Sequence, residues 1–263
     1  YGKDGSLHYE CPLFHEELAI LDFDETSHTF VSPQKQNPQE EEVADICHSL
    51  QYGIRSFMEN AGLSKVVLGV SGGIDSAVNA ALYASILPKE NILLVNMPSV
   101  YNSSMTKDLA QQLADHIGCY YTVIPVQDSL ELTRKQFREA PLLQNGEEKG
   151  HLALTSFIEE NIQARDRSSR ILAAAAAAFG GVFTCNANKA ESSVGYATLY
   201  GDHAGFLAAT ADLWKHQVYA LARYLNDVVF QREVVPQGSI DIVPSAELSA
   251  SQDITKGQGD PIV

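Results

Sequence analysis

Hydrophobic residues change their spacing along the chain at about residue 40. Before this point, residues 7–10 and 18–23 alternate between apolar and polar positions, which predicts short strands. Residues 32–39 are rich in Pro and Gln, and this composition predicts a linker. From there to Ala61, apolar residues recur at helical spacing. The chain is therefore expected to contain a small front part and a larger second part.

The second part alternates between strands and helices joined by short connections. Continuous apolar runs predict strands at residues 65–70, 92–97, 121–126 and 182–185. Helical spacing predicts helices at residues 40–61, 76–87, 108–118, 129–137, 155–179 and 215–229, and residues 140–150 are expected to form a loop. This alternation indicates an α/β fold with an open, mostly parallel, doubly wound sheet covered by helices on both faces. Such sheets bind ligands at the carboxyl ends of their strands.

The loop after the first of these four strands has the clearest chemical pattern. Residues 71–76 read SGGIDS, and two adjacent glycines allow the backbone to turn its N–H groups inward. These groups, the start of the next helix and the hydroxyls of Ser71 and Ser76 could bind phosphate. A carboxylate such as Asp75 repels phosphate unless a cation lies between them, and Mg2+ is the natural cation. The segment lacks the endings of the P-loop and of the GxGxxG motif. A plain glycine turn with Asp75 and Ser76 as helix caps is the alternative.

Residues 71–76 resemble the pyrophosphatase loop of the N-type ATP pyrophosphatases, which cleave ATP between its α- and β-phosphates. Four later segments resemble the synthetase domain of the glutamine-dependent NAD synthetase family. They are residues 160–167 (ENIQARDR), 186–191 (NANKAE), 194–226 (containing YATLYGD and DLWKHQ) and 244–248 (PSAEL). The resemblance covers roughly residues 35–263, with the motifs in family order. Asn186 and Ala190 stand where the family has glycine and serine.

The resemblance implies a ligase that adenylates the nicotinate carboxylate of deamido-NAD with ATP, releases pyrophosphate, and then uses ammonia to form NAD and AMP. It implies catalytic roles for Asp75, Asp202 and Lys215. ATP and pyrophosphate would contact Gly69, Ser71, Gly72, Gly73, Asp75, Ser76, Arg165, Lys189, Lys215 and Ser245. Deamido-NAD would contact Asn161, Arg165, Tyr200 and Asp202, and Mg2+ would contact Asp75 and Glu191.

The front part of the chain resembles the last strands of a nitrilase-like glutaminase domain. Residues 1–34 are expected to be a remnant of that domain with its linker, and residues 35–263 the synthetase domain. The glutaminase catalytic residues are absent from this chain, so the nitrogen donor is expected to be free ammonia. Two local strands without such an origin are the alternative. The family also implies a homodimer or a higher homo-oligomer.

Composition narrows the expected partners and compartment. The chain has 263 residues and a formal net charge of −15, which disfavours nucleic acid and anionic membranes as partners. Its four cysteines are outside metal-site spacing, which is typical of free thiols in a reducing compartment. No apolar run approaches the roughly 18 residues of a membrane span. We therefore expect a cytoplasmic protein.

Two alternative functions stay open at this point. One is another ATP-pyrophosphatase amide ligase, similar to GMP synthetase, although residues 196–202 (YATLYGD) argue against it. The other is a nucleotide-binding module without activity. Asn186 keeps this second alternative open, because glycine at that position would allow closer approach of the backbone to adenosine.

Overall fold

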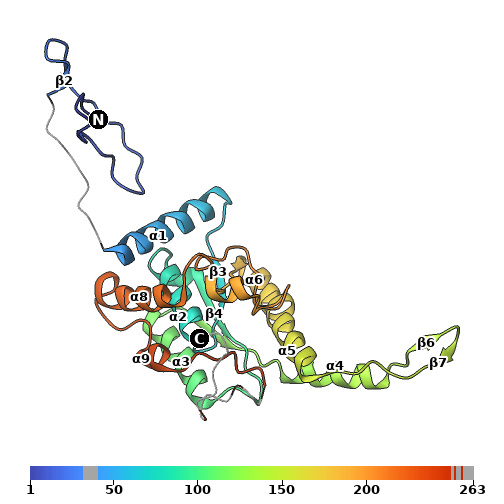
Figure 1. The fold of residues 1–263 in the computed structure, drawn as a ribbon. Helices are drawn as coiled ribbons and strands as arrows, with labels where there is room; N and C mark the ends of the chain where they lie inside the picture. The colour runs from blue at the N-terminus through green and yellow to red at the C-terminus, as the bar shows by residue number, and fades with distance from the viewer. Residues whose placement is uncertain (32–40, 250–251, 253–255, 257–263) are drawn as a thin grey trace. The chain divides into compact units, whose positions relative to one another are not determined.

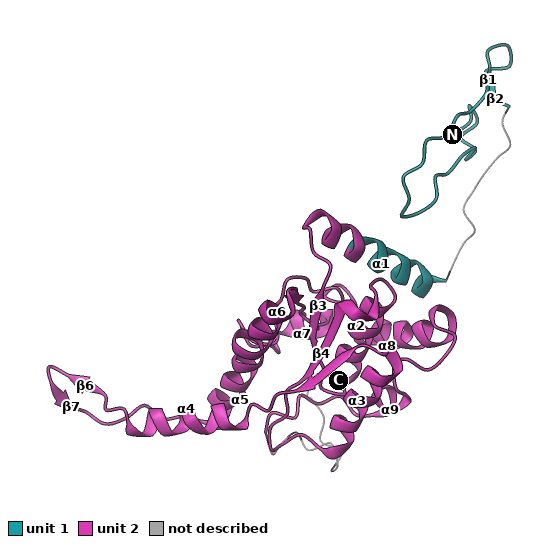
Figure 2. Ribbon diagram, turned by 180° about the vertical axis from the view of Figure 1, so that it is seen from behind, with its two compact units in different colours: residues 1–53 teal, residues 54–263 magenta. Residues whose placement is uncertain are grey.

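The computed structural model describes residues 1–31, 41–249, 252 and 256 (Figure 1). The predicted linker at residues 32–39 lies outside the described residues. Contacts divide the chain into two compact units, residues 1–53 and residues 54–263 (Figure 2). Helix α1 (Glu42–Asn60) contains the boundary between the two units.

Regular structure is sparse at the start of the first unit. Strands β1 (Phe23–Asp24) and β2 (Thr29–Phe30) form a short antiparallel pair. The turn between them is closed by Asp24, which accepts a hydrogen bond from the Thr26 backbone at 2.8 Å. The predicted strand at residues 18–23 is wrong apart from Phe23, and residues 7–10 form only an isolated bridge. Alternation alone does not make a strand, because a strand also needs a neighbour that accepts and donates its backbone hydrogen bonds.

The second unit is built around a four-stranded sheet with the order β5-β4-β3-β8, in which every neighbouring pair is parallel. The strands are β3 (Val66–Gly69), β4 (Ile92–Asn96), β5 (Tyr120–Val123) and β8 (Val182–Phe183). The two central strands are buried: Val67 and Leu94 have no exposed side-chain area. The predicted parallel sheet is therefore confirmed, although each of its four strands is shorter than the sequence indicated.

Helices cover both faces of the sheet (Figure 1). Helix α2 (Ile74–Ala84) and helix α3 (Ser104–Ile117) pack against β4, and α8 (Lys215–Tyr224) and α9 (Gln237–Asp241) pack against α2. The other face carries the π-helical segment η2 (Asp166–Leu172) and helix α6 (Ala173–Phe179), which contact β3. The remaining helical elements are η1 (Lys89–Asn91), α4 (Gln127–Glu139), α5 (Ser156–Arg165), α7 (Lys189–Val194) and the π-helical η3 (Leu225–Val229). The doubly wound α/β fold is confirmed.

Several boundaries differ from the sequence prediction for identifiable reasons. The predicted helix at residues 155–179 forms as α5, η2 and α6, with a π-helical stretch in its middle. Helix α3 begins before residue 108 because Ser103 caps it, accepting a hydrogen bond from the Thr106 backbone at 3.1 Å. The predicted loop at residues 140–150 contains the hairpin of β6 (Leu143–Gln144) and β7 (Glu147–Glu148). An Asn-Gly turn with positive φ at both residues closes this hairpin.

None of the helices in the described part of the chain is long and apolar enough to span a membrane.

Candidate functional site

The predicted phosphate loop connects β3 to α2. Gly72 has φ +91°, and a Cβ atom there would lie 2.2 Å from the backbone oxygen of Thr106, so only glycine fits. Ser71 and Ser76 brace the loop: the Ser71 backbone N–H donates to Ser76 Oγ at 3.3 Å, and Gly73 N–H donates to Ser71 Oγ at 3.2 Å. Gly73 occupies the N-cap position of α2 and has no side chain, so the backbone N–H groups in the first turn of α2 receive no side-chain cap from that position. Backbone N–H groups at such a helix start bind anions well.

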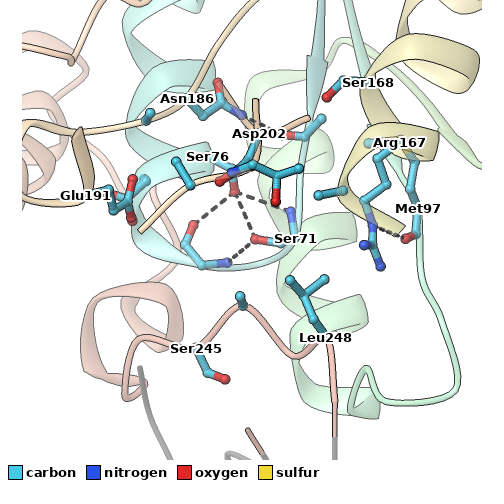
Figure 3. A pocket seen from close by; sticks show the side chains of 18 of the residues that line it. Ser71, Ser76, Met97, Arg167, Ser168, Asn186, Glu191, Asp202, Ser245 and Leu248 are labelled. Atoms are coloured by element: carbon cyan, nitrogen blue, oxygen red, sulfur yellow. Dashed lines mark hydrogen bonds between the residues drawn. The ribbon is translucent and has the colours of Figure 1, made fainter. Parts of the chain in front are cut away.

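A cavity of about 380 Å³ opens at the carboxyl ends of the central strands, beside this loop (Figure 3). Most of the predicted site residues line it. They are Gly69, Ser71, Gly73, Asp75, Ser76, Asn161, Glu191, Asp202, Lys215 and Ser245. The tertiary structure thus brings together residues from the loop, α5, α7, α8 and the C-terminal part of the described chain.

Asp75 is held by two partners from distant helices. Lys215 Nζ donates to Asp75 Oδ2 at 2.5 Å, and Asn188 Nδ2 donates to Asp75 Oδ1 at 2.9 Å. Burial by itself would lower the pKa of Lys215, but the nearby charges of Asp75 and Glu191 and the hydrogen bond to Asp75 outweigh it and raise that pKa. The ammonium group therefore stays charged at neutral pH and is available to a negatively charged ligand.

Glu191 lies in the first turn of α7 in a reciprocal capping arrangement. Its backbone N–H donates to Asn188 Oδ1 at 3.1 Å, and its own Oε2 accepts from the Asn188 N–H at 3.1 Å. Burial, and after it the charge of Asp75, raises the pKa of Glu191 to about 7. A buried carboxylate beside a second carboxylate suits a cation that prefers oxygen ligands, such as Mg2+.

Within the described residues, no group of three or more His, Cys, Asp or Glu side chains is arranged to hold a metal. Asp75 and Glu191 would therefore need oxygen ligands from a bound phosphate or from water to complete a Mg2+ shell, which is the usual arrangement for this ion. The residues present fit the ion on these terms.

Thr198 joins two predicted substrate-binding residues. Its backbone N–H donates to Asp202 Oδ1 at 2.7 Å, and its hydroxyl donates to Asn161 Oδ1 at 2.9 Å. Both Asp202 and Asn161 line the cavity. The segment between α7 and α8 is thereby tied to α5 at the edge of the site.

Four predicted site residues do not line the cavity. Gly72 is a buried residue of the loop itself, and Lys189 lies with its Nζ 4.9 Å from the centre of the Trp214 ring. Arg165 is exposed and donates through Nε to the Leu199 backbone oxygen at 3.2 Å, and Tyr200 is 77% exposed. The substrate contacts predicted for these residues stay predictions.

Arg167, two positions after Arg165, lines the cavity and was not among the predicted site residues. Its Nε donates to the Met97 backbone oxygen at 3.0 Å, and burial lowers the pKa of its guanidinium to about 10 (Figure 3). Its Nη1 is buried without a hydrogen-bond partner among the described residues. Both arginines belong to the motif at residues 160–167, and the structure leaves Arg165 exposed while Arg167 lines the cavity.

Asn186, which departs from the family pattern, also lines the cavity. Its Nδ2 donates to the Gly69 backbone oxygen at 2.8 Å, which connects the ends of β8 and β3 (Figure 3). The side chain is therefore a brace between the two strands that carry the site.

A parallel doubly wound sheet with a glycine-rich anion loop at the carboxyl end of a central strand defines an α/β nucleotide-binding domain of the adenine nucleotide alpha hydrolase-like type. Within that class, the chain belongs to the NAD synthase family, whose model matches residues 46–260. The resemblance drawn from the sequence motifs is confirmed.

Individual relatives show how much of a longer protein this chain represents. A glutamine-dependent NAD(+) synthetase from Synechocystis sp. is 35% identical over 250 residues, which are 95% of this chain and 42% of that protein. The chain thus spans less than half the length of this curated relative.

Two solved structures are similar over most of the chain. One is a glutamine-dependent NAD+ synthetase from Acinetobacter baumannii in complex with ADP, with a TM-score of 0.76 and 27% identity, covering 98% of this chain and 49% of that one. The other is an NMN synthetase from Francisella tularensis, with a TM-score of 0.68 and 26% identity, covering 83% of this chain and 82% of that one.

Proposed function

We propose that this chain carries the synthetase reaction of its family: ATP-dependent amidation of the nicotinate carboxylate of deamido-NAD with ammonia. The observation that carries the proposal is the Asp75–Lys215 pair where the phosphate loop enters α2, inside the cavity at the strand ends. This arrangement places an ammonium group, a carboxylate and backbone N–H groups of a helix start around one space, as adenylyl transfer from ATP requires.

In the first step, a carboxylate oxygen of the substrate forms a bond to the α-phosphorus of ATP. The bond between that phosphorus and the oxygen bridging to the β-phosphate breaks, and pyrophosphate leaves with the electron pair. Backbone N–H groups and hydroxyls of residues 71–76 bind the departing pyrophosphate, and the charged Lys215 stabilises the negative charge on the phosphates. When bound by Asp75 and Glu191, Mg2+ would neutralise part of the charge on the same phosphates.

In the second step, the nitrogen of ammonia forms a bond to the carboxyl carbon of the acyl-adenylate. The bond from that carbon to the AMP oxygen breaks, AMP leaves with the electron pair, and the nitrogen loses one proton. Adenylation is required because a free carboxylate is a poor electrophile. Asp202, which lines the cavity, is the residue we assign to accept the proton.

A second candidate differs in the size of the substrate. The similarity to an NMN synthetase structure, which extends over 82% of that chain, favours testing nicotinic acid mononucleotide beside deamido-NAD. The chemistry at the phosphate loop would be the same, and the difference would lie in how the rest of the substrate is bound.

The proposal is tested by mass spectrometry of the products formed from ATP, Mg2+ and ammonium with either substrate. We expect NAD, AMP and pyrophosphate from deamido-NAD. Preferential amidation of the mononucleotide would support the second candidate. Binding of ATP without AMP formation from either substrate would instead identify a nucleotide-binding module without activity.

Three further parts of the proposal concern the setting of this activity. We propose that the chain acts with a glutaminase domain, that it assembles as a homodimer or a higher homo-oligomer, and that it works in the cytoplasm. Sequence coverage of less than half of a glutamine-dependent relative supports the first part. Light scattering of the purified chain tests the second, and a single species with the mass of the monomer would contradict it.

A further inference from the structure

Residues 244–248, the PSAEL segment, contribute four side chains to the cavity but turn the fifth away from it. Pro244, Ser245, Ala246 and Leu248 line the cavity, whereas Glu247 does not. In Figure 3, Ser245 and Leu248 lie below the loop that carries Ser71. Glu247 is only 3% exposed, and a carboxylate is rarely buried so fully without dedicated partners.

Glu247 finds its partners at the start of α3. Its Oε1 accepts a hydrogen bond from the Ser103 backbone N–H at 3.1 Å. Its Oε2 accepts from Thr106 Oγ1 at 2.8 Å and from Asn102 Nδ2 at 3.2 Å. A negative charge at a helix N-terminus is also favoured by the helix dipole. The carboxylate therefore joins the PSAEL segment to a helix that lies more than a hundred positions earlier in the chain.

The same turn of α3 supports the phosphate loop. Gly72 lies so close to Thr106 that a Cβ atom on Gly72 would meet the Thr106 backbone oxygen at 2.2 Å. Thr106 thus contacts the phosphate loop through its backbone and Glu247 through its hydroxyl. The two segments that line opposite parts of the cavity share one rigid support.

The backbone at Glu247 is in a conformation that its own residue type disfavours. Its φ is +47°, in the left-handed region that residues with a Cβ atom rarely adopt. Such a conformation persists where surrounding interactions over-determine it, and it is found preferentially near binding sites. The three hydrogen bonds of the Glu247 carboxylate are interactions of this kind, and a fourth bond nearby, from Gln163 Nε2 to the Leu248 oxygen at 3.0 Å, holds the end of the segment.

We propose that Glu247 is a positioning residue that fixes the PSAEL segment to the first turn of α3 and thereby holds this wall of the cavity in place against a nucleotide bound on residues 71–76. This inference rests on the proposed function, because it takes ATP to be the nucleotide in the cavity. Ser245 belongs to the same brace, since its Oγ accepts a hydrogen bond from the Glu247 backbone N–H at 3.2 Å and donates one to the Gln252 backbone oxygen at 2.9 Å. Glu247 acts through the segment and does not touch the nucleotide itself.

The first test measures ATP binding by isothermal titration calorimetry in the presence of Mg2+ and without the second substrate. Glu247→Ala is expected to raise the Kd for ATP about tenfold, because misplacement of the segment should weaken binding by about as much as the loss of one hydrogen bond. Glu247→Gln keeps one acceptor oxygen for the Ser103 N–H and should give an intermediate Kd. Asp115→Ala, which removes an exposed carboxylate from the far end of α3, is the matched control and should bind as the unaltered chain does.

Steady-state kinetics separates positioning from general loss of structure. Glu247→Ala should raise KM for ATP about tenfold while changing kcat and KM for the carboxylate substrate much less. A fall in melting temperature with an unchanged Kd and KM for ATP would show a purely structural role and overturn the inference. Should the alanine variant fail to fold, the same comparison is made with Glu247→Gln.

A double-mutant cycle tests whether Glu247 and Ser245, which are joined by a hydrogen bond, act together in holding the segment. Ser245→Ala should weaken ATP binding in the otherwise unaltered chain and have little further effect when Glu247 is already alanine. Independent, additive effects would contradict this joint action. The outcomes also separate the two proposals. If the unaltered chain does not bind ATP, the proposed function is refuted. If the unaltered chain binds ATP no more tightly than Glu247→Ala does, only this inference is refuted.

Discussion

The two sides of the cavity are built by different kinds of interaction. On the loop side, residues 69–76, two bracing hydrogen bonds join near neighbours, as between Ser71 and Ser76, and Asn186 and Ser239 add bonds to the Gly69 and Gly72 oxygens from far along the chain. On the facing side, the bonds that reach Asp75 come from Asn188 and Lys215, which are 113 and 140 positions away. The loop geometry is therefore set in part by the loop's own residues, whereas the charge arrangement depends on distant residues of the α7 and α8 region.

The two sides also differ in charge. The bonds that brace the loop side are made by neutral groups, namely backbone N–H groups and two serine hydroxyls. The facing side brings Glu191 and Lys215 to Asp75, and the pKa of each of these two groups is raised there. Phosphate binding and the placement of charged groups thus depend on different residues. Substitutions on the loop side and on the facing side should therefore change different measured properties.

The largest effect is expected where the two sides meet. Asp75→Ala removes the carboxylate that holds Lys215, and we expect kcat for pyrophosphate release to fall about 10³-fold, as for the loss of a main electrostatic element of a site. The fold should persist, because Asp75 lies at the start of α2 with a partly exposed side chain. Pyrophosphate release by a coupled assay measures this change.

Glu147→Gln is the control for that prediction, because it disrupts an ion pair with Lys149 in the exposed β6–β7 hairpin. Its turnover should match that of the unaltered chain. Undiminished turnover in Asp75→Ala would contradict the role that we propose for the Asp75–Lys215 pair.

Gly72→Ala tests the loop side by sterics alone. The added Cβ atom would meet the Thr106 backbone oxygen at 2.2 Å, and the φ of +91° disfavours alanine. We expect a loss of about 3 kcal/mol in the free energy of unfolding. Gly62→Ala is the matched control, since Gly62 also has a positive φ (+68°) but a Cβ atom there would have no neighbour within 4 Å among the described residues, so about 1 kcal/mol is expected. Chemical denaturation measures both, and equal losses would contradict the steric argument.

The pH dependence of stability tests the facing side. Because the pKa of Glu191 is raised to about 7 in the folded chain, the folded state holds a proton that the unfolded state has released between roughly pH 4.5 and pH 7. Stability from this group is therefore present at low pH and is lost as the pH rises through that window. We expect a loss of about 2 kcal/mol between pH 5 and pH 8, after allowance for partial solvation.

Glu191→Gln should remove most of this decline, as measured by urea unfolding in a chelator at several pH values. A decline of the same size in the glutamine variant would mean that another group causes it. Added Mg2+ should also reduce the decline in the unaltered chain, because the ion favours the ionised carboxylate.

The smallest effect is expected at the hydrogen bond between Asn186 and Gly69, which connects the ends of β8 and β3. Asn186→Ala removes the hydrogen bond to the Gly69 oxygen and should lower the free energy of unfolding by about 1 kcal/mol. Asn186→Gly restores the residue type usual in the family and loses the same bond. If glycine permits closer approach to adenosine, this variant should bind ATP at least as tightly as the alanine variant, and weaker binding by the glycine variant would contradict that expectation.

Sequence patterns predicted those features that depend on near neighbours. The parallel α/β sheet followed from buried runs such as residues 65–70, and the phosphate loop followed from SGGIDS directly after that run. The motifs also indicated the family, which the match over residues 46–260 confirms. Each of these signals lies within a few consecutive residues, where the spacing of side chains and the freedom of glycine determine the local backbone.

Tertiary structure alone decided which chemically suitable residues face the cavity. Arg165 and Arg167 are equivalent by composition, and their spacing of two places them on nearly opposite sides of a helix without saying which one faces inward. The structure shows that Arg167 lines the cavity and that Arg165 is exposed. Glu247 could not be assigned from the sequence either, since its partners at the start of α3 lie 141 to 145 positions away. Short-range periodicity carries no information about contacts over such separations, which arise only when the helices pack on the sheet.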